Sequence, residues 1–202
     1  MPNVSVATFN VHWGGLTRRF FEYDVASAVR SLDADIVILQ EVWWPDGGEP
    51  PATQLSEYES FPIQLGRGRR LPPLPPHIQE ESSNGWSGVA LLSRLPIIDT
   101  QRISLGRINN DKVPTRALGK IQVQLPGDTF TVIGFHASRD AWLTSALHNL
   151  RRIEHVLADL PGHSLAGGDC NMWGPIVCSI MPKWKRAVVG KTWPAHRPHS
   201  QI

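Results

Sequence analysis

The chain has 202 residues, of which 41% are hydrophobic and 19% are charged, and this balance is typical of one globular domain. A chain of this length hides roughly 70% of the surface that its unfolded form exposes, so its core needs neither disulfides nor a structural metal. The net charge is only +2, which permits a phosphate-bearing partner but does not by itself indicate one.

The N-terminal part of the chain predicts a strand, a helix and a buried strand. Residues 4–9 alternate in polarity and are rich in β-forming side chains. Residues 24–32 carry apolar residues at helical spacing, and residues 36–39 form a continuous apolar run. These patterns place a helix between two strands.

Residues 43–76 are rich in glycine, proline and charge, so we expect a long surface insertion without a regular ladder. Trp43 and Trp44 stand at its start, before a proline, and we expect this pair to be exposed. The insertion contains Gly66-Arg67-Gly68-Arg69-Arg70, which lacks the third glycine of a dinucleotide-binding loop. We interpret this run as a solvated basic loop, with contact to a substrate backbone as the alternative.

The middle of the chain predicts four successive strands, at residues 86–92, 97–103, 116–125 and 129–135. Gly127 and Asp128 are typical of a hairpin turn between the last two strands. Because no helical pattern separates these four strands, we expect mostly antiparallel pairing.

A helix and a last strand complete the pattern. Residues 140–160 place seven apolar side chains on one helical stripe, and residues 164–168 read as a strand. Strands at both ends with helices between them predict an α/β (α+β) fold of four layers. Two mostly antiparallel sheets then pack face to face between helices. We expect residues 1–202 to belong to a single domain.

Polar residues follow four of the predicted strands, at the point where each strand ends. They are Asn10, Glu41, His136, Asp169 and Asn171. Because the ends of strands in a rigid sheet can hold side chains in a shared cleft, we expect these five to converge. One or two carboxylates with substrate phosphate oxygens are the usual ligands of Mg²⁺. The sequence therefore predicts a site for Mg²⁺ (or Mn²⁺) and a phosphate group.

Each of these residues has a predicted role and a structural alternative. Glu41 with Asn10 supplies a sparse metal site, and His136 is suited to donate to a phosphate oxygen. Asp169 and Asn171, two apart on an extended segment, point the same way, so one handles a water proton while the other orients phosphate. Alternatively, Asp169 and Asn171 form a turn, Glu41 caps a loop, and His136 is a core histidine.

These residues lie in segments that resemble the endonuclease/exonuclease/phosphatase superfamily. This superfamily includes pancreatic deoxyribonuclease, abasic-site endonucleases, sphingomyelinases and inositol-phosphate phosphatases. The resemblance rests, in the family's order, on the segments at residues 9–14, 35–42, 88–97, 135–138 and 168–171. Leu39-Gln40-Glu41 and Gly168-Asp169-Cys170-Asn171 are its specific elements.

The resemblance implies a four-layer α/β sandwich and a divalent-metal-dependent phosphoester hydrolase, a phosphodiesterase of the nuclease type. It implies that Asn10 and Glu41 belong to the metal shell and that His136 contacts phosphate. It further implies that Asp169 and Asn171 activate water and hold phosphate.

Members of the superfamily continue with an Ile-Asp-type strand and a Ser-Asp-His-type segment, whereas this sequence stops at Ile202. We therefore expect a C-terminally incomplete domain. The alternative to an active enzyme is a non-catalytic remnant that binds metal and phosphate.

Four further residues are candidate substrate contacts: His12, Trp43, Arg116 and Trp173. Trp43 and Trp173 follow site residues closely, so they are suited to stack on a base or sugar or to rest on lipid, with core packing as the alternative. Arg116 either reaches phosphate or only snorkels to the surface. We expect a phosphoester substrate, most readily nucleic acid, with phospholipid and inositol phosphate left open.

A different enzyme class is suggested by Ser164, which lies in a Gly-x-Ser-x-Ala run similar to the nucleophile elbow of serine esterases. The elbow needs a strand before the serine and a helix after it, whereas a predicted helix precedes Ser164 and a strand follows. This reading stays as a minor alternative.

The two cysteines, Cys170 and Cys178, match no common zinc spacing with His163, so we interpret them as packing thiols. The sequence shows no charged-then-apolar leader and no apolar run long enough to span a bilayer. We expect a monomer in the reducing cytoplasm.

Overall fold

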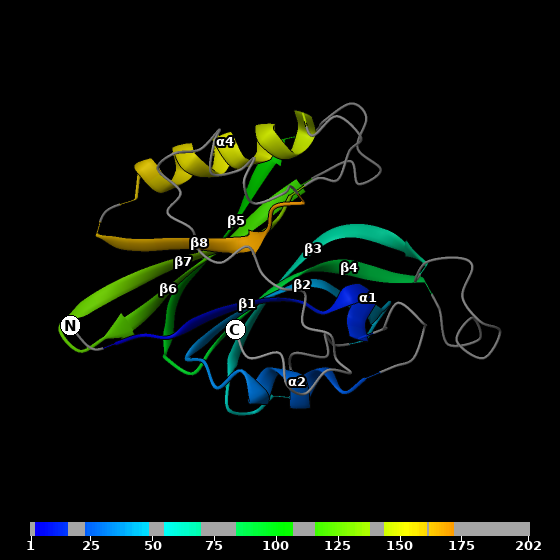
Figure 1. Ribbon diagram of the computed structural model, residues 1–202, viewed down its shortest axis with the longest axis horizontal. Coiled ribbons are helices and arrows are strands. Elements are labelled where there is room, and N and C mark those ends of the chain that lie inside the picture. Colours follow the sequence, from blue (N-terminus) through cyan, green and yellow to red (C-terminus); the bar gives the residue numbers. More distant parts are fainter. Residues whose placement is uncertain are drawn as a thin grey trace.

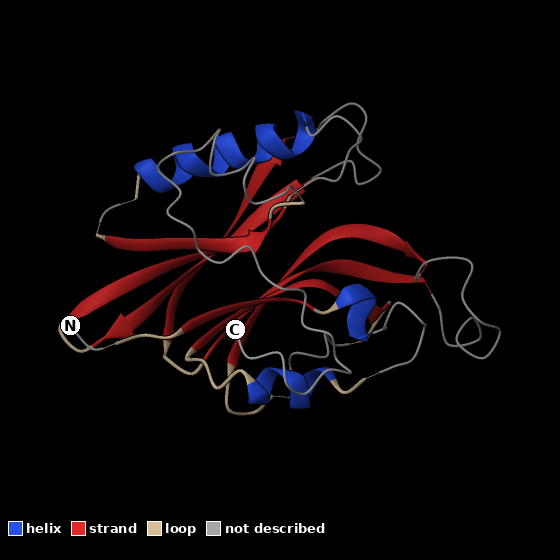
Figure 2. Cartoon of the chain, in the orientation of Figure 1, coloured by secondary structure: helices blue, strands red, loops and turns tan. Residues whose placement is uncertain are grey.

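The computed structural model describes residues 3–15, 23–48, 55–69, 84–106, 116–137, 144–160 and 162–171. In this part of the chain, two four-stranded sheets lie face to face, with helices outside them (Figure 1, Figure 2). The result is an α/β sandwich of four layers, which confirms the predicted fold class.

The first sheet contains β1 (Val6–Asn10), β2 (Ile36–Pro45), β3 (Glu59–Arg69) and β4 (Asn84–Ser93). The order across it is β1-β2-β4-β3. The pair β1 and β2 is parallel, and the other two pairs are antiparallel. β1 is therefore an edge strand of this sheet.

The second sheet contains β5 (Ile97–Gly106), β6 (Arg116–Leu125), β7 (Asp128–His136) and β8 (His163–Asp169), in that order. Its one parallel pair is β7 and β8, and the other two pairs are antiparallel. In each sheet a helical connection precedes the second strand of the parallel pair, as parallel strands require.

The described helices are α1 (His12–Gly15), α2 (Val25–Ser31) and α4 (Thr144–Ala158). α2 begins at Asp24, whose Oδ1 accepts from the N–H groups of Ala26 (2.9 Å) and Ser27 (3.2 Å) and so satisfies two donors of the first turn. Figure 1 shows α2 outside the first sheet and α4 outside the second sheet.

Three apolar clusters hold the four layers together. The cluster between α2 and the first sheet includes Val29, Val37 and Leu39, and the cluster between α4 and the second sheet includes Ile133, Leu150 and Ile153. The cluster between the sheets is built from side chains of both, namely Ile36, Ile38, Ile63, Leu65, Val89, Leu91, Ala117, Ile121, Val123 and Val132. Burial of this apolar surface is the main driving force for the sandwich.

Glycines let the two sheets approach closely next to the strand ends. Gly119, Gly134 and Gly167 are register partners across β6, β7 and β8. A Cβ on Gly134 would lie 2.9 Å from Cγ2 of Ile38 and 3.0 Å from Cγ of Leu91, both in the first sheet. No side chain larger than hydrogen fits this contact without movement.

The prediction for residues 43–76 is wrong in two respects. β2 continues to Pro45, and Trp44 is buried with 4% exposure, so Trp43 and Trp44 are not an exposed loop pair. Residues 59–69 form β3, so Gly66 to Arg69 belong to a strand and not to a loop, and Arg70 lies outside the described residues. Pro62 fits there because β3 is an edge strand.

The remaining predicted elements agree with the structure apart from their ends. The hairpin turn between β6 and β7 is formed by Pro126 and Gly127, with φ of 75° at Gly127, and Asp128 already pairs with Leu125. Residues 140–143 of the predicted helix lie outside the described residues. No helix in the described part of the chain is long and apolar enough to span a bilayer.

Candidate active site

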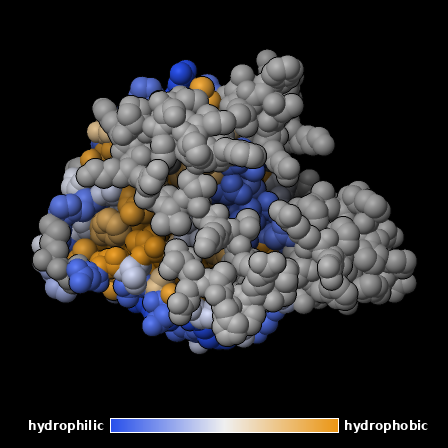
Figure 3. All heavy atoms as spheres, viewed as in Figure 1, coloured by the Kyte–Doolittle hydropathy of each residue, from blue (hydrophilic) through white to orange (hydrophobic). Residues whose placement is uncertain are grey.

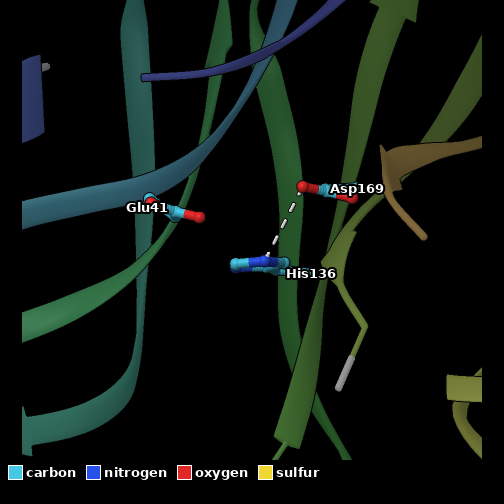
Figure 4. Close-up of side chains that lie close together, drawn as sticks. All are labelled: Glu41, His136 and Asp169. Atoms are coloured by element: carbon cyan, nitrogen blue, oxygen red, sulfur yellow. Dashed lines mark ion pairs between the residues drawn. The ribbon is translucent and has the colours of Figure 1, made fainter. Parts of the chain in front are cut away.

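Three side chains from the two sheets converge at one place, two of them from strand ends and the third, Glu41, from within β2 and not from its end as the sequence suggested. Glu41 comes from β2, His136 from the end of β7 and Asp169 from the end of β8. One ligand atom of each lies within 4.8 Å of the others, and all three residues are half-buried. Figure 4 shows the three side chains pointing toward one another. In Figure 3, hydrophilic residues gather near the middle of the face shown, and hydrophobic residues lie to their left.

A β-bulge aims Glu41 at this cluster. Gln40 pairs with Val89 and Val42 pairs with Gly88, so Glu41 is the extra residue of β2. Its φ of 57° lies in the left-handed region, which the backbone of residues other than glycine seldom adopts. Without the bulge, strand alternation would exchange the faces of Val42 and all later residues. The bulge thus releases Glu41 from the ladder while Val42 stays in the α2 cluster.

His136 and Asp169 are held side by side by the parallel register of β7 and β8, in which they are direct partners. Nε2 of His136 lies 3.9 Å from Oδ2 of Asp169. The backbone N–H of Ala137 donates to the carbonyl of Asp169 over 2.8 Å and extends the pairing by one residue. Both side chains lie on the face of the sheet that Gly134 and Gly167 turn toward the first sheet.

Asn10, the last residue of β1, joins the two carboxylates. Its Nδ2 donates to Oε1 of Glu41 (3.0 Å) and to Oδ2 of Asp169 (2.9 Å). Its Oδ1 accepts from the backbone N–H of His12 over 2.8 Å. For Asn10 to present an oxygen to a cation, the amide would have to turn and lose the His12 hydrogen bond.

Asn171 does not continue the extended segment, as the sequence suggested. Its φ is 49°, and its N–H donates to Oδ1 of Asp169 over 2.8 Å in the manner of an Asx turn. Its Nδ2 donates to the carbonyl of Ala137 over 2.6 Å. The side chain of Asn171 therefore ties the ends of β7 and β8 together, and its predicted role in holding phosphate stays a proposal.

The four predicted substrate contacts differ in burial and in their position relative to the site. His12 is half-buried with φ of 50°, and Trp43 is half-buried two residues after Glu41. Arg116 begins β6 with 7% exposure and shares the strand alternation of Leu118, which packs toward α4. Trp173 lies outside the described residues. Their contacts with substrate stay predictions.

The serine-esterase alternative lacks its structural context. Ser164 pairs with Thr131 inside β8, and the element before it is the helix α4. A nucleophile elbow requires the reverse order. Cys170 packs against the α4 cluster, in agreement with a packing thiol, whereas Cys178 lies outside the described residues.

The donor set fits a hard divalent cation. Two carboxylates and an imidazole lie within reach of one another, and Oε1 of Glu41 and Oδ2 of Asp169 share a single amide donor. Carboxylate oxygens are the protein ligands that Mg²⁺ and Mn²⁺ prefer. Glu41 and Asp169 are therefore the residues best placed to hold such an ion.

The sequence analysis assigned no role to two residues at this site, Gln40 and Tyr23. Gln40 is buried, and its Nε2 donates to Oγ1 of Thr8 (3.0 Å) and to the carbonyl of Ile38 (2.9 Å), which fixes β2 next to β1 just before Glu41. The hydroxyl of Tyr23 donates to the carbonyl of Val11 over 2.8 Å. In the sequence, the dipeptide Gly14-Gly15 was the signal that could have predicted the tight turn contacted by Tyr23.

The described site thus joins two carboxylates, an imidazole and the amide of Asn10 between the two sheets of an α/β sandwich. The family model described as "Endonuclease/Exonuclease/phosphatase family" matches residues 7–191. The chain belongs to this family. A search of curated protein sequences finds no significant match.

Solved structures of the same family share the fold. An endonuclease/exonuclease/phosphatase from Beutenbergia cavernae superposes with a TM-score of 0.62 at 19% identity and covers 84% of this chain and 48% of that one. TDP2 from D. rerio, in complex with single strand DNA product, gives 0.59 at 17% identity, over 88% and 64%. TDP2 from C. elegans gives 0.56 at 19% identity, over 84% and 48%. The chain thus spans about half to two thirds of these structures.

Proposed function

We propose that this protein is a divalent-metal-dependent phosphoester hydrolase that cleaves phosphodiesters. The observation that carries the proposal is the convergence of Glu41, His136 and Asp169 from both sheets within 4.8 Å. Membership of the family and the TDP2-like fold support a phosphodiesterase or nuclease type of activity.

The residues divide the work as follows. Glu41 would hold Mg²⁺ (or Mn²⁺), the amide of Asn10 would orient that carboxylate by donating to its Oε1, and Asp169 would accept a proton from the attacking water at its carboxylate. His136 donates to a phosphate oxygen as negative charge builds there, and Asn171 holds the phosphate. The bound ion supplies charge neutralisation and orientation of substrate and leaving group. The new bond joins water oxygen to phosphorus, and the bond to the leaving oxygen breaks.

We propose nucleic acid as the first substrate to test. The TDP2 structure from D. rerio holds single strand DNA product, and Trp43 lies close to Glu41, where an indole is suited to stack on a base. Discrimination between diesters and monoesters, and among DNA, RNA, phospholipid and inositol phosphate, is expected to reside in surface segments such as residues 43–85.

The test compares the wild type with Glu41→Gln and Asp169→Asn on a panel of phosphodiesters and phosphomonoesters, with Mg²⁺, with Mn²⁺ and with chelator. Each variant should lose about 10²–10⁴-fold in rate. Glu57→Gln is the matched control, because Glu57 is an exposed carboxylate paired with Arg30 over 2.8 Å outside the site. Unchanged rates in either site variant would remove that residue from its role, and full activity with chelator would remove the metal.

The main alternative is a protein that binds metal and phosphate without turnover. It is favoured if Mg²⁺ shifts the melting temperature of the wild type but not of Glu41→Gln, and no substrate on the panel is cleaved. Labelling of Ser164 by a fluorophosphonate would support the esterase alternative instead.

We infer further that the protein is a monomer and works in a reducing, cytoplasmic compartment. The second inference is supported by the two cysteines, which we interpret as free packing thiols. Light scattering on the purified chain tests the first inference, and localisation of a tagged chain tests the second.

A further inference from the structure

A left-handed turn carries the chain from β1 across the site. His12, Gly14 and Gly15 of α1 have φ values of 50°, 70° and 99°. A Cβ on Gly14 would lie 2.9 Å from Cβ of Trp43, and one on Gly15 would lie 2.8 Å from Cγ2 of Val25. The turn is therefore pressed between β2 and the start of α2, and only glycine fits at these two positions.

Tyr23 holds this turn at both of its ends. Its hydroxyl donates to the carbonyl of Val11 over 2.8 Å, just before the turn, and its N–H donates to the carbonyl of Gly15 over 2.9 Å. Burial, followed by the negative charge of Glu41, raises the pKa of the Tyr23 phenol well above its usual value. The phenol thus stays protonated, donates at neutral pH and lies within electrostatic reach of Glu41.

This turn also fixes the side-chain amide of Asn10 between the carboxylates of Glu41 and Asp169. The N–H of Val11 donates to the carbonyl of Gln40 (2.9 Å), and the N–H of His12 donates to Oδ1 of Asn10 (2.8 Å). The second hydrogen bond aims Nδ2 of Asn10 at Glu41 and Asp169. The backbone from Val11 to His12 therefore decides which way the amide of Asn10 points.

We propose that Tyr23 is a positioning residue of the active site, which fixes the turn at residues 12–15 and through it the orientation of Asn10 between Glu41 and Asp169. This inference rests on the proposed function of the cluster. Loss of the hydroxyl would leave the Val11 carbonyl with the N–H of Gly15 (2.9 Å) as its donor and would free the turn from its side-chain tie to Tyr23, so that the backbone of Val11 and His12 could move. Small displacements of this kind reduce rates strongly, because catalysis depends on geometry within about 1 Å.

The chain offers a matched control, since it has only two tyrosines. The hydroxyl of Tyr58 donates to the carbonyl of Ala34 over 2.9 Å, in a contact that is more buried than that of Tyr23. Ala34 precedes the start of β2, whereas Glu41 lies at the bulge within this strand. Tyr23→Phe and Tyr58→Phe thus remove the same kind of hydrogen bond, inside and outside the site.

The experiment measures melting temperature, kcat, KM and the Mn²⁺ concentration that half-saturates the cation-induced shift in melting temperature. Both variants should lower the melting temperature by about 2–4 °C. Tyr23→Phe should also lower kcat about 10-fold at unchanged KM and raise the half-saturating Mn²⁺ concentration several-fold, because the carboxylates are no longer preorganised. Tyr58→Phe should leave kcat and the Mn²⁺ concentration within about 2-fold of the wild type, since its hydroxyl acts far from the cluster.

Equal effects of the two variants on kcat and on the Mn²⁺ response would overturn the inference, because they would mean that Tyr23 only adds stability. If the wild type hydrolyses no substrate, the Mn²⁺ response alone decides the matter. An inactive wild type with a Tyr23-specific Mn²⁺ response contradicts the proposed function and supports the positioning role. An active wild type, with equal effects of Tyr23→Phe and Tyr58→Phe on kcat and on the Mn²⁺ response, supports the proposed function and contradicts the positioning role.

Discussion

Nδ2 of Asn10 donates to Oδ2 of Asp169 over 2.9 Å and thereby links the edge strand β1 of one sheet to the edge strand β8 of the other. The same nitrogen donates to Glu41, so one neutral amide separates two carboxylates. Such an arrangement is stable only while the amide presents its N–H groups, because an oxygen there would face two negative charges.

We expect Asn10→Asp to destabilise the protein more than Asn10→Ala when a chelator is present. The aspartate adds a third carboxylate at the cluster, whereas alanine only removes the shared donor. Removal of that donor should reduce the free energy of unfolding by about 1–3 kcal/mol. Addition of Mg²⁺ should close the gap between the two variants, because a cation neutralises the extra charge.

Thermal unfolding in chelator and in Mg²⁺ checks this prediction. Gln122→Ala serves as a control, since it removes an amide hydrogen bond to Thr129 (3.0 Å) on the second sheet. Its response to Mg²⁺ should match that of the wild type. A gap between the two Asn10 variants that is the same in both buffers would contradict the role of this amide.

Glu41 illustrates a conflict between stability and function. Its φ of 57° favours glycine, whereas its carboxylate points into the cluster. We expect Glu41→Gly to be more stable than Glu41→Ala by about 1 kcal/mol, because glycine adopts the left-handed region without a Cβ clash. Both variants should be inactive.

Urea unfolding of the same two substitutions at Gln40 provides the control. Gln40 precedes the bulge, and its φ is not positive. There glycine should be less stable than alanine by about 0.5–1 kcal/mol, because it loses more backbone entropy on folding. The same order at both positions would show that the bulge stores no strain at Glu41.

The strand-end residues of the site could be predicted from the sequence, because each is marked by the apolar pattern of the strand just before it. Asn10, His136 and Asp169 each end a strand with a clear apolar pattern, and parallel register then places His136 beside Asp169. The four-layer fold follows from the same patterns, since each strand and helix has one face to bury.

Other features depend on contacts distant in sequence and could not be predicted this way. β3 carries Pro62 and alternating glycine and arginine, so only its position at the edge of the sheet makes it a strand. The bulge at Glu41 depends on pairing with β4, and the orientation of Asn10 depends on the turn after β1. Tertiary context decides all three.

The close approach of the sheets gives a further prediction. We expect Gly134→Ala to reduce the free energy of unfolding by about 1–3 kcal/mol, because its Cβ would meet branch atoms of Ile38 and Leu91 at 2.9–3.0 Å. Gly167→Ala should have a smaller effect, since its nearest neighbour is the terminal Cδ1 of Ile38 at 2.8 Å. Ile38→Val removes that methyl and should relieve Gly167→Ala but not Gly134→Ala. Denaturant unfolding of the two double variants decides between these outcomes.

The starts of β1 and β2 are joined by an acid-sensitive contact. The N–H (2.8 Å) and hydroxyl (2.7 Å) of Ser5 both donate to Oδ2 of Asp35, and the N–H of Asp35 donates to Oγ of Ser5 (3.0 Å). These bonds, the backbone donor first, hold the pKa of Asp35 below its usual value. The ionised carboxylate therefore stabilises the fold above the unfolded pKa of about 3.9, and this stabilisation is lost as the pH falls through the lower, folded value.

We expect Asp35→Asn to lower the melting temperature at pH 7 and the difference from wild type to shrink as the pH falls below about 4. The contact is largely exposed, so the effect at pH 7 should not exceed about 1 kcal/mol. Melting curves between pH 3 and 7 test the trend, with Asp159→Asn, an exposed carboxylate after α4, as control. A difference that stays constant across this range would mean that the carboxylate of Asp35 contributes through its shape and not through its charge.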